Sequence, residues 1–120
     1  MPTTVYVVAA QSDRSWIESA LAPGAGTDTV FLDDESSLLI NPPSVGCCVV
    51  VMADMNEAAA LAMVRDLRSL GSMLPVIVLG SHTAFRTAVE IARFPATDFL
   101  ERPVSGHQLR AAVSRACAGA

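Results

Sequence analysis

Apolar residues along the chain form two kinds of pattern, short continuous runs and longer stretches in which they recur at helical intervals. The runs are rich in β-branched residues, which is typical of parallel strands covered on both faces. They predict five strands, at residues 4–9, 29–32, 47–52, 76–79 and 98–100. The first, third and fourth runs are continuously apolar, so we expect these strands at the centre of a sheet.

Between the runs, apolar residues return every three or four positions, which predicts amphipathic helices. Ser105 and Gln108 have the spacing of a capping box before the last helix, and Gly71 follows the end of a central one. Residues 33–40 form a weaker helix candidate. The expected buried stripes are Trp16, Ile17, Ala20 and Leu21; Ala60, Met63, Val64, Leu67 and Leu70; Phe85, Ala88, Val89 and Ala92; and Leu109, Ala112, Val113 and Ala116.

Strands that alternate with helices predict right-handed βαβ units, and hence an α/β fold with a doubly wound parallel sheet. The 120 residues match the common size of one domain, so we expect a single domain over residues 1–120. In such folds, ligands and chemistry gather at the carboxyl ends of the strands. The residues expected there are Ala9, Ala10, Gln11, Asp33, Asp34, Met52, Ala53, Asp54, Gly80, Ser81, Glu101 and Arg102.

Composition and charge argue against several classes of function. The net charge is −4, which gives no basic footprint for a phosphate backbone, so we expect no direct nucleic-acid binding by this domain. Apolar runs fall short of the roughly 18 residues of a membrane span, and the N-terminus lacks the pattern of a signal peptide. We therefore expect a cytoplasmic protein without membrane contact, whose Cys47, Cys48 and Cys117 are reduced thiols.

Five segments carry a more specific pattern: VYVV at 5–8, GCCVVV at 46–51, PVIVLGSHT at 75–83, AVE at 88–90 and DFLERPV at 98–104. Together they resemble the CheY-like receiver domain of response regulators, closest to the FixJ type, over nearly the whole chain. The resemblance implies a flavodoxin-like (βα)5 fold with strand order 2-1-3-4-5 and a cis peptide bond before Pro103. It also implies signal transduction in a two-component system and transcription regulation, because FixJ-type receivers usually precede a DNA-binding output domain.

Receivers of this family accept a phosphoryl group from a histidine kinase on an aspartate that ends the third strand. A Mg²⁺ held by that aspartate and an acidic pair, together with a hydroxyl and a lysine, neutralises the phosphoryl charge. The corresponding positions here are Ala9 and Ala10 for the acidic pair, Met52 or Val51 for the acceptor, Gly80 beside Ser81 for the hydroxyl, and Arg102 for the lysine. We therefore predict a degenerate receiver, or pseudo-receiver, that is not an enzyme, holds no metal or cofactor and acts independently of phosphorylation.

Two other functions stay open at this point. Asp54 lies near the lost acceptor, and as a displaced phosphorylation site it would make the chain a functional phospho-receiver. The favoured interpretation of Asp54 is a solvated loop acid or a partner for Arg102. The mouth around Arg102 and Ser81 would suit a small-molecule-sensing module, in which Arg102 holds an anion, although pairing with Asp54 or exposure to solvent is favoured for Arg102.

A surface for partners is expected where the fourth helix, the fifth strand and the fifth helix meet, since receivers commonly dimerise there. With the expected stripe of the fourth helix buried, a step of about 100° per residue leaves Ile91 and Phe94 exposed. Phe99 stands where the switching aromatic of the family lies. The candidate contact residues for a homodimer or a protein partner are Arg86, Glu90, Ile91, Arg93, Phe94, Phe99, Glu101 and Arg110.

Overall fold

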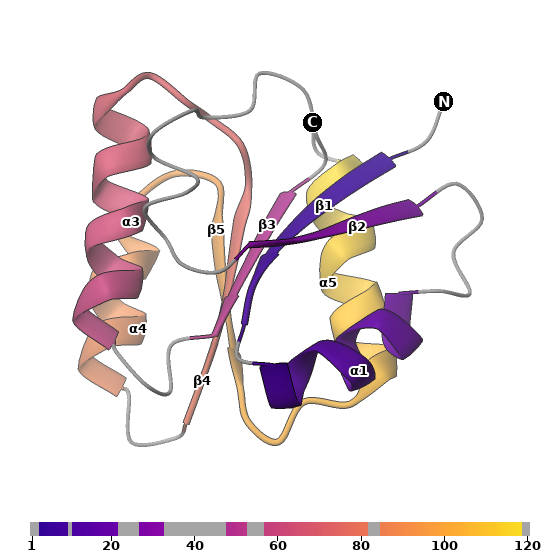
Figure 1. Ribbon diagram of the computed structural model, residues 1–120. Helices are drawn as coiled ribbons and strands as arrows, with labels where there is room; N and C mark the ends of the chain where they lie inside the picture. The colour runs from indigo at the N-terminus through magenta and orange to yellow at the C-terminus, as the bar shows by residue number, and fades with distance from the viewer. Residues whose placement is uncertain are drawn as a thin grey trace.

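Five parallel strands form one sheet in the computed structural model, which describes residues 3–9, 11–21, 27–32, 48–52, 57–81 and 85–118. The strand order is β2-β1-β3-β4-β5, which confirms the order that the resemblance implied (Figure 1). All five predicted runs fall in strands, with boundaries shifted by at most two residues. The strands are β1 (Thr3–Val8), β2 (Thr27–Leu32), β3 (Cys48–Met52), β4 (Val76–Gly80) and β5 (Thr97–Glu101).

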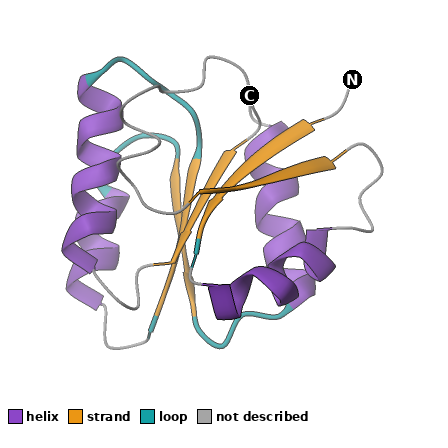
Figure 2. Ribbon diagram, in the orientation of Figure 1, coloured by secondary structure: helices purple, strands orange, loops and turns teal. Residues whose placement is uncertain are grey.

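Four described helices cover the two faces of the sheet. Figure 2 shows α1 and α5 packed on one face and α3 and α4 on the other, so the sheet is doubly wound as expected. The weaker helix candidate at residues 33–40 lies outside the described residues. The helices are α1 (Gln11–Leu21), α3 (Glu57–Ser69), α4 (Phe85–Ala92) and α5 (Gly106–Ala118).

Side chains of the central strands alternate between two apolar clusters, one beneath each helical layer. Val5 and Val50 pack with residues of α1 and α5, whereas Val49 and Val51 pack with residues of α3 and α4. Cys48 belongs to the first cluster, and its burial raises the pKa of the thiol to about 12. The thiol is therefore protonated at neutral pH and acts as a small apolar side chain.

Two helix ends can be compared with the capping residues that the sequence predicted. The capping box before α5 is confirmed, since the Ser105 N–H donates to Gln108 Oε1 at 2.9 Å and the Gln108 N–H donates to Ser105 Oγ at 3.1 Å. α3 ends at Ser69, and Gly71 follows in the left-handed region at a φ of 85°. The placement of Leu70 in the buried stripe was wrong: it lies beyond the helix end and is 60% exposed.

The buried stripe of α4 also differs from the expected one. Thr87 and Ile91 lie one turn apart and are both buried, and Phe94 packs beside them against the α3 side of the sheet. The expected exposure of Ile91 is therefore wrong, since this side chain is 1% exposed. The residues that the sequence placed inside are instead half-buried or exposed: Ala88, Val89 and Ala92.

The turn between α4 and β5 is fixed by a single guanidinium from α3. Arg68 Nη1 donates to the carbonyl oxygen of Ser72 at 2.9 Å, Nε to that of Pro95 at 3.0 Å and Nη2 to that of Ala96 at 3.1 Å. Ala96 has a φ of 57°, a conformation that is strained for a residue with a Cβ. Burial lowers the pKa of Arg68 from its ordinary value, yet an arginine side chain remains cationic at neutral pH.

Candidate functional site

The carboxyl edge of the sheet brings together several residues that the sequence singled out. Ala9 follows β1 and is buried, Met52 ends β3 and packs against the α1 side of the core, and Gly80 ends β4. Ser81 follows as a half-buried residue, and the backbone N–H of Arg102 donates to the Gly80 carbonyl oxygen at 2.8 Å. Ala10 and Asp54, which the sequence also singled out, lie outside the described residues.

Arg102 reaches across this edge to the first helix. Its Nη2 lies 3.2 Å from Oδ1 of Asp13, and the side chains are 30% and 21% exposed. The indole N–H of Trp16 donates to the same oxygen of Asp13 at 3.0 Å. The peptide bond between Arg102 and Pro103 is cis, which confirms that prediction. One partner of Arg102 is thus an acid of α1, Asp13, which the sequence pattern did not single out.

A second arginine joins the same end of α1 to the strands. Arg14 Nε lies 3.4 Å from the carbonyl oxygen of Ala9, and its Nη2 lies 3.3 Å from that of Leu32. Its guanidinium also stacks over Phe31, 5.4 Å from the ring centroid. Arg14 and Asp13 therefore tie the first turn of α1 to the ends of β1, β2 and β5.

The described residues of this edge do not provide the ligands of the magnesium ion that receivers of the family hold. Mg²⁺ needs oxygen ligands in nearly octahedral geometry and is usually held by one or two carboxylates. Ala9 and Met52 offer none, and Oδ1 of Asp13 already bonds Trp16 and Arg102. Within the part of the chain that the structure describes, no group of three or more His, Cys, Asp or Glu residues is placed to hold a metal ion.

Sequence reasoning missed Asp13 and Arg14 because no motif marks them, and it gave Trp16 only as an apolar residue of the first helix. One signal did exist: all three follow directly on the first strand, so they begin the helix at the carboxyl edge of the sheet. The sequence does not say that Asp13 meets a residue 89 positions away. That pairing follows from the packing of α1 beside α5 on one face of the sheet, which brings the start of α1 close to the segment that joins β5 to α5.

We expect Asp13 and Arg102 to be energetically coupled. In a double-mutant cycle of Asp13→Ala and Arg102→Ala, the coupling in the free energy of unfolding should be about 1 kcal/mol, because the pair is partly buried and shares Trp16. Urea denaturation measures it, and the indole N–H shift of Trp16, the single tryptophan of the chain, reports Asp13→Ala directly. Additive single-variant effects and an unmoved indole signal would contradict the pairing.

Only some of the residues that the sequence analysis expected on the interaction face of α4, β5 and α5 are exposed. Arg86, Arg93 and Glu101 are exposed, and Arg93 Nη1 lies 3.7 Å from Oε1 of Glu90. Phe94 and Phe99 are half-buried against the α3 side of the core, and Ile91 is buried. Arg110 points elsewhere, since its Nη1 lies 3.5 Å from the carbonyl oxygen of Ala20 in α1. Among the described side chains of α4, the large apolar one that is exposed is instead Val89, at 41%.

Comparison with known proteins adds to this geometry. No protein-family model matches the chain. The chain is 30% identical over 88 residues to the response regulator protein TodT of Pseudomonas putida, an alignment that covers 73% of this chain and 36% of TodT. It is 25% identical over 119 residues to the transcriptional regulatory protein FixJ of Bradyrhizobium diazoefficiens, covering 97% of this chain and 58% of FixJ. The chain thus spans between 36% and 58% of the length of these relatives.

A solved structure shows the same fold. A response regulator receiver domain protein from Clostridium thermocellum superposes with a TM-score of 0.84 at 16% identity, over 98% of this chain and 95% of that one. Among the described helices, none has the length and apolar character needed to cross a membrane. The strand order, the superposition and the similarity to response regulators together identify the chain as a response-regulator receiver domain.

Proposed function

We propose that this receiver domain transmits its signal without an aspartyl phosphate, by docking to a protein partner or to a second copy of itself through α4, β5 and α5. It is a binding module rather than an enzyme. The chemistry of phosphoryl transfer needs an oxygen nucleophile and a hard cation to neutralise the charge on the transferred group. The residues at the carboxyl edge supply neither in the family's positions.

The single observation that carries this proposal is the ion pair at the carboxyl edge. Arg102 lies 3.2 Å from Asp13, and the resemblance to receivers assigns Arg102 to the position of the lysine and Ala9 and Met52 to positions of oxygen ligands. The protein's own carboxylate thus provides a negative partner for the guanidinium at this edge. This ion pair supports a site in which the charge of Arg102 is balanced within the protein, without a phosphoryl group.

The docking face combines one exposed apolar side chain with charges of both signs. Val89 is 41% exposed, Arg86 and Arg93 are exposed about one turn before and after it along the chain, and Glu101 is exposed at the end of β5. Mixed charges around an apolar contact suit a two-fold interface, in which each patch meets its own copy. FixJ is a transcriptional regulatory protein of which this chain spans 58%, and this supports an output in transcription through an appended domain.

We expect Mg²⁺ and phosphoryl mimics to leave the domain unchanged. In amide NMR spectra, addition of Mg²⁺ with beryllofluoride should not shift the signals of Gly80, Ser81 or Arg102, because the oxygen ligands for the cation are missing. A receiver domain that retains the acidic pair and the acceptor aspartate serves as the positive control. Saturable shifts at these amides would overturn phosphorylation independence.

The companion variant Met52→Asp restores the acceptor alone. It should take up no phosphate from acetyl phosphate, since Ala9 and Ala10 still leave the cation without its acidic pair. Intact-protein mass spectrometry detects the added phosphoryl group. Phosphorylation of the wild type would instead favour a displaced acceptor such as Asp54, and phosphorylation of Met52→Asp alone would show that the acidic pair is dispensable.

A further inference from the structure

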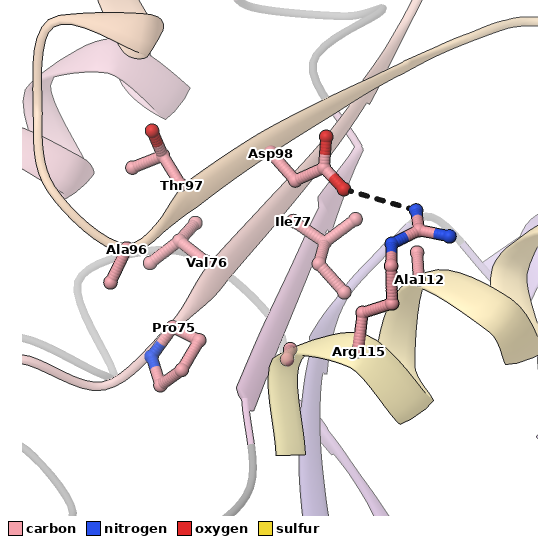
Figure 3. Close-up of a pocket in the computed structure, with 9 residues that line it drawn as sticks. Pro75, Val76, Ile77, Ala96, Thr97, Asp98, Ala112 and Arg115 are labelled. Atoms are coloured by element: carbon pink, nitrogen blue, oxygen red, sulfur yellow. Dashed lines mark hydrogen bonds and ion pairs between the residues drawn. The ribbon is translucent and has the colours of Figure 1, made fainter. Parts of the chain in front are cut away.

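A cavity of about 280 Å³ lies at the opposite end of the sheet, between the amino ends of β4 and β5 and the last turns of α5. Ile77 and Ala112 are both 1% exposed and lie at its base, within the apolar cluster of the α1 and α5 side. Pro75, Val76, Ala96 and Ala116 complete its apolar lining. Figure 3 shows Ile77 between β4 and α5, with one charged side chain contributed by each of β5 and α5.

The two charges at the rim of this cavity face each other across it. Arg115 Nη2 lies 3.4 Å from Oδ2 of Asp98, and the side chains are 65% and 45% exposed. A long and solvated ion pair contributes little to stability, so separating its partners costs little. The cavity therefore combines an apolar base with one cation, Arg115, and one anion, Asp98, and both can bind the charged groups of a ligand.

We propose that this cavity binds an α-amino acid with an aliphatic side chain. The carboxylate of the ligand would take a hydrogen bond from Arg115, its ammonium group would donate to Asp98, and its side chain would lie on Ile77 and Ala112. Each charge of the broken ion pair then regains an opposite charge. The volume is that of about nine water molecules at roughly 30 Å³ each, and leucine has about as many non-hydrogen atoms.

The wall of the cavity is held in place before any ligand arrives. Ala96 lies on the turn that Arg68 fixes through the carbonyl oxygens of Pro95 and Ala96. The Val76 N–H also donates to the Ala96 carbonyl oxygen at 2.9 Å, which joins the first residues of β4 and β5. A preformed wall lowers the entropy that a small ligand must lose on binding.

The site is also connected to the proposed docking face. Asp98 Oδ1 accepts the backbone N–H of Phe99 at 2.9 Å, so one carboxylate touches both the cavity rim and β5. A ligand that draws Asp98 away from Arg115 would therefore also change the hydrogen bond that the backbone N–H of Phe99 donates to Asp98. This coupling rests on the proposed function, whereas ligand binding itself does not depend on it.

Titration of the wild-type chain with L-leucine, followed by amide NMR, tests the site. Saturable shifts are expected at residues 96–99 and 112–116, with a dissociation constant of about 1 mM or below for a ligand of this size. Glycine, 4-methylpentanoate and isoamylamine lack the side chain, the ammonium group and the carboxylate respectively. Each should bind at least tenfold more weakly than leucine.

Variants separate this site from general surface binding. Arg115→Gln and Asp98→Asn should each weaken leucine binding about tenfold, and Ala116→Leu should abolish it by filling the cavity. Arg110→Gln is the matched control, because this arginine lies on the same helix but contacts α1. Absent saturation with leucine, equal binding of 4-methylpentanoate, or wild-type affinity in Arg115→Gln would each overturn the proposal. Sedimentation with and without leucine then tests the coupling, and an unchanged association would remove only the link to the docking face.

Discussion

Ile91→Asp should unfold the domain or come close to it, with a loss of about 4 kcal/mol or more in the free energy of unfolding. The side chain is 1% exposed and packs between α3 and the sheet, among residues such as Met63 and Val78. A carboxylate placed there has no partner for its charge, and burying it is among the largest single-residue penalties known. Since domains of this size are stable by only about 5–15 kcal/mol, urea denaturation followed by circular dichroism resolves the loss.

Val89→Asp is the matched variant, two residues earlier on the same helix. Its side chain is 41% exposed, so the free energy of unfolding should change by no more than about 0.5 kcal/mol. In sedimentation, the same variant should weaken self-association or partner binding through α4. Stable folding of Ile91→Asp would show that the burial of α4 is wrong. Unchanged association of folded Val89→Asp would exclude this helix from the docking face.

The contrast between these two residues shows how far the pattern of α4 could be predicted from the sequence. Its position was predicted correctly, because apolar residues recur at helical spacing over residues 85–92. The face that α4 buries was not predicted correctly. Ala88 and Ala92 are small enough to lie either in the core or at the surface, and Thr87 is polar yet buried. Orientation is decided by packing on α3 and β5, which the local pattern does not contain.

Strands were easier to predict than helix faces. β3 and β4 are covered on both sides, so every residue is selected to be apolar and the run stands out without any knowledge of its neighbours. β5 lies at the sheet edge, and all its residues remain half-buried or exposed. Its short run at residues 98–100 was still enough to place the strand, although the observed strand is one residue longer at each end.

The candidate site also has one part that residue identity alone describes and another part that depends on the three-dimensional fold. The lack of oxygen side chains at Ala9, Ala10 and Met52 is a matter of residue identity, and their assignment to the family's ligand positions stays a prediction from the resemblance. The pairing of Arg102 with Asp13 depends on where α1 begins relative to β5, and no spacing rule connects the two. The cavity beside Arg115 is likewise formed by β4, β5 and α5 together, and each lining residue alone looks like ordinary surface or core.

Arg68 shows how much one long-range contact of this kind contributes to the fold. Its guanidinium joins the end of α3 to the turn before β5 through the carbonyl oxygens of Pro95 and Ala96, and it also donates to the carbonyl oxygen of Ser72 just after α3. Hydrogen bonds to a charged group contribute about 1.5–3 kcal/mol each when buried, but these are partly solvated and the freed carbonyls can bind water. The net contribution should therefore be smaller than the sum of three such bonds.

Arg68→Ala should lower the free energy of unfolding by about 2 kcal/mol, which corresponds to a fall of about 8 °C in Tm for a domain of this length. Arg65→Ala is the control one turn earlier, because its guanidinium is exposed and its contact with Asp66 at 3.5 Å is solvated, so it should cost no more than about 0.5 kcal/mol. Arg68→Lys keeps the charge but not the three-way geometry and should recover less than half of the loss. Thermal unfolding by circular dichroism compares the variants, and equal stability of Arg68→Ala and Arg65→Ala would show that the turn before β5 holds its strained Ala96 without help from α3.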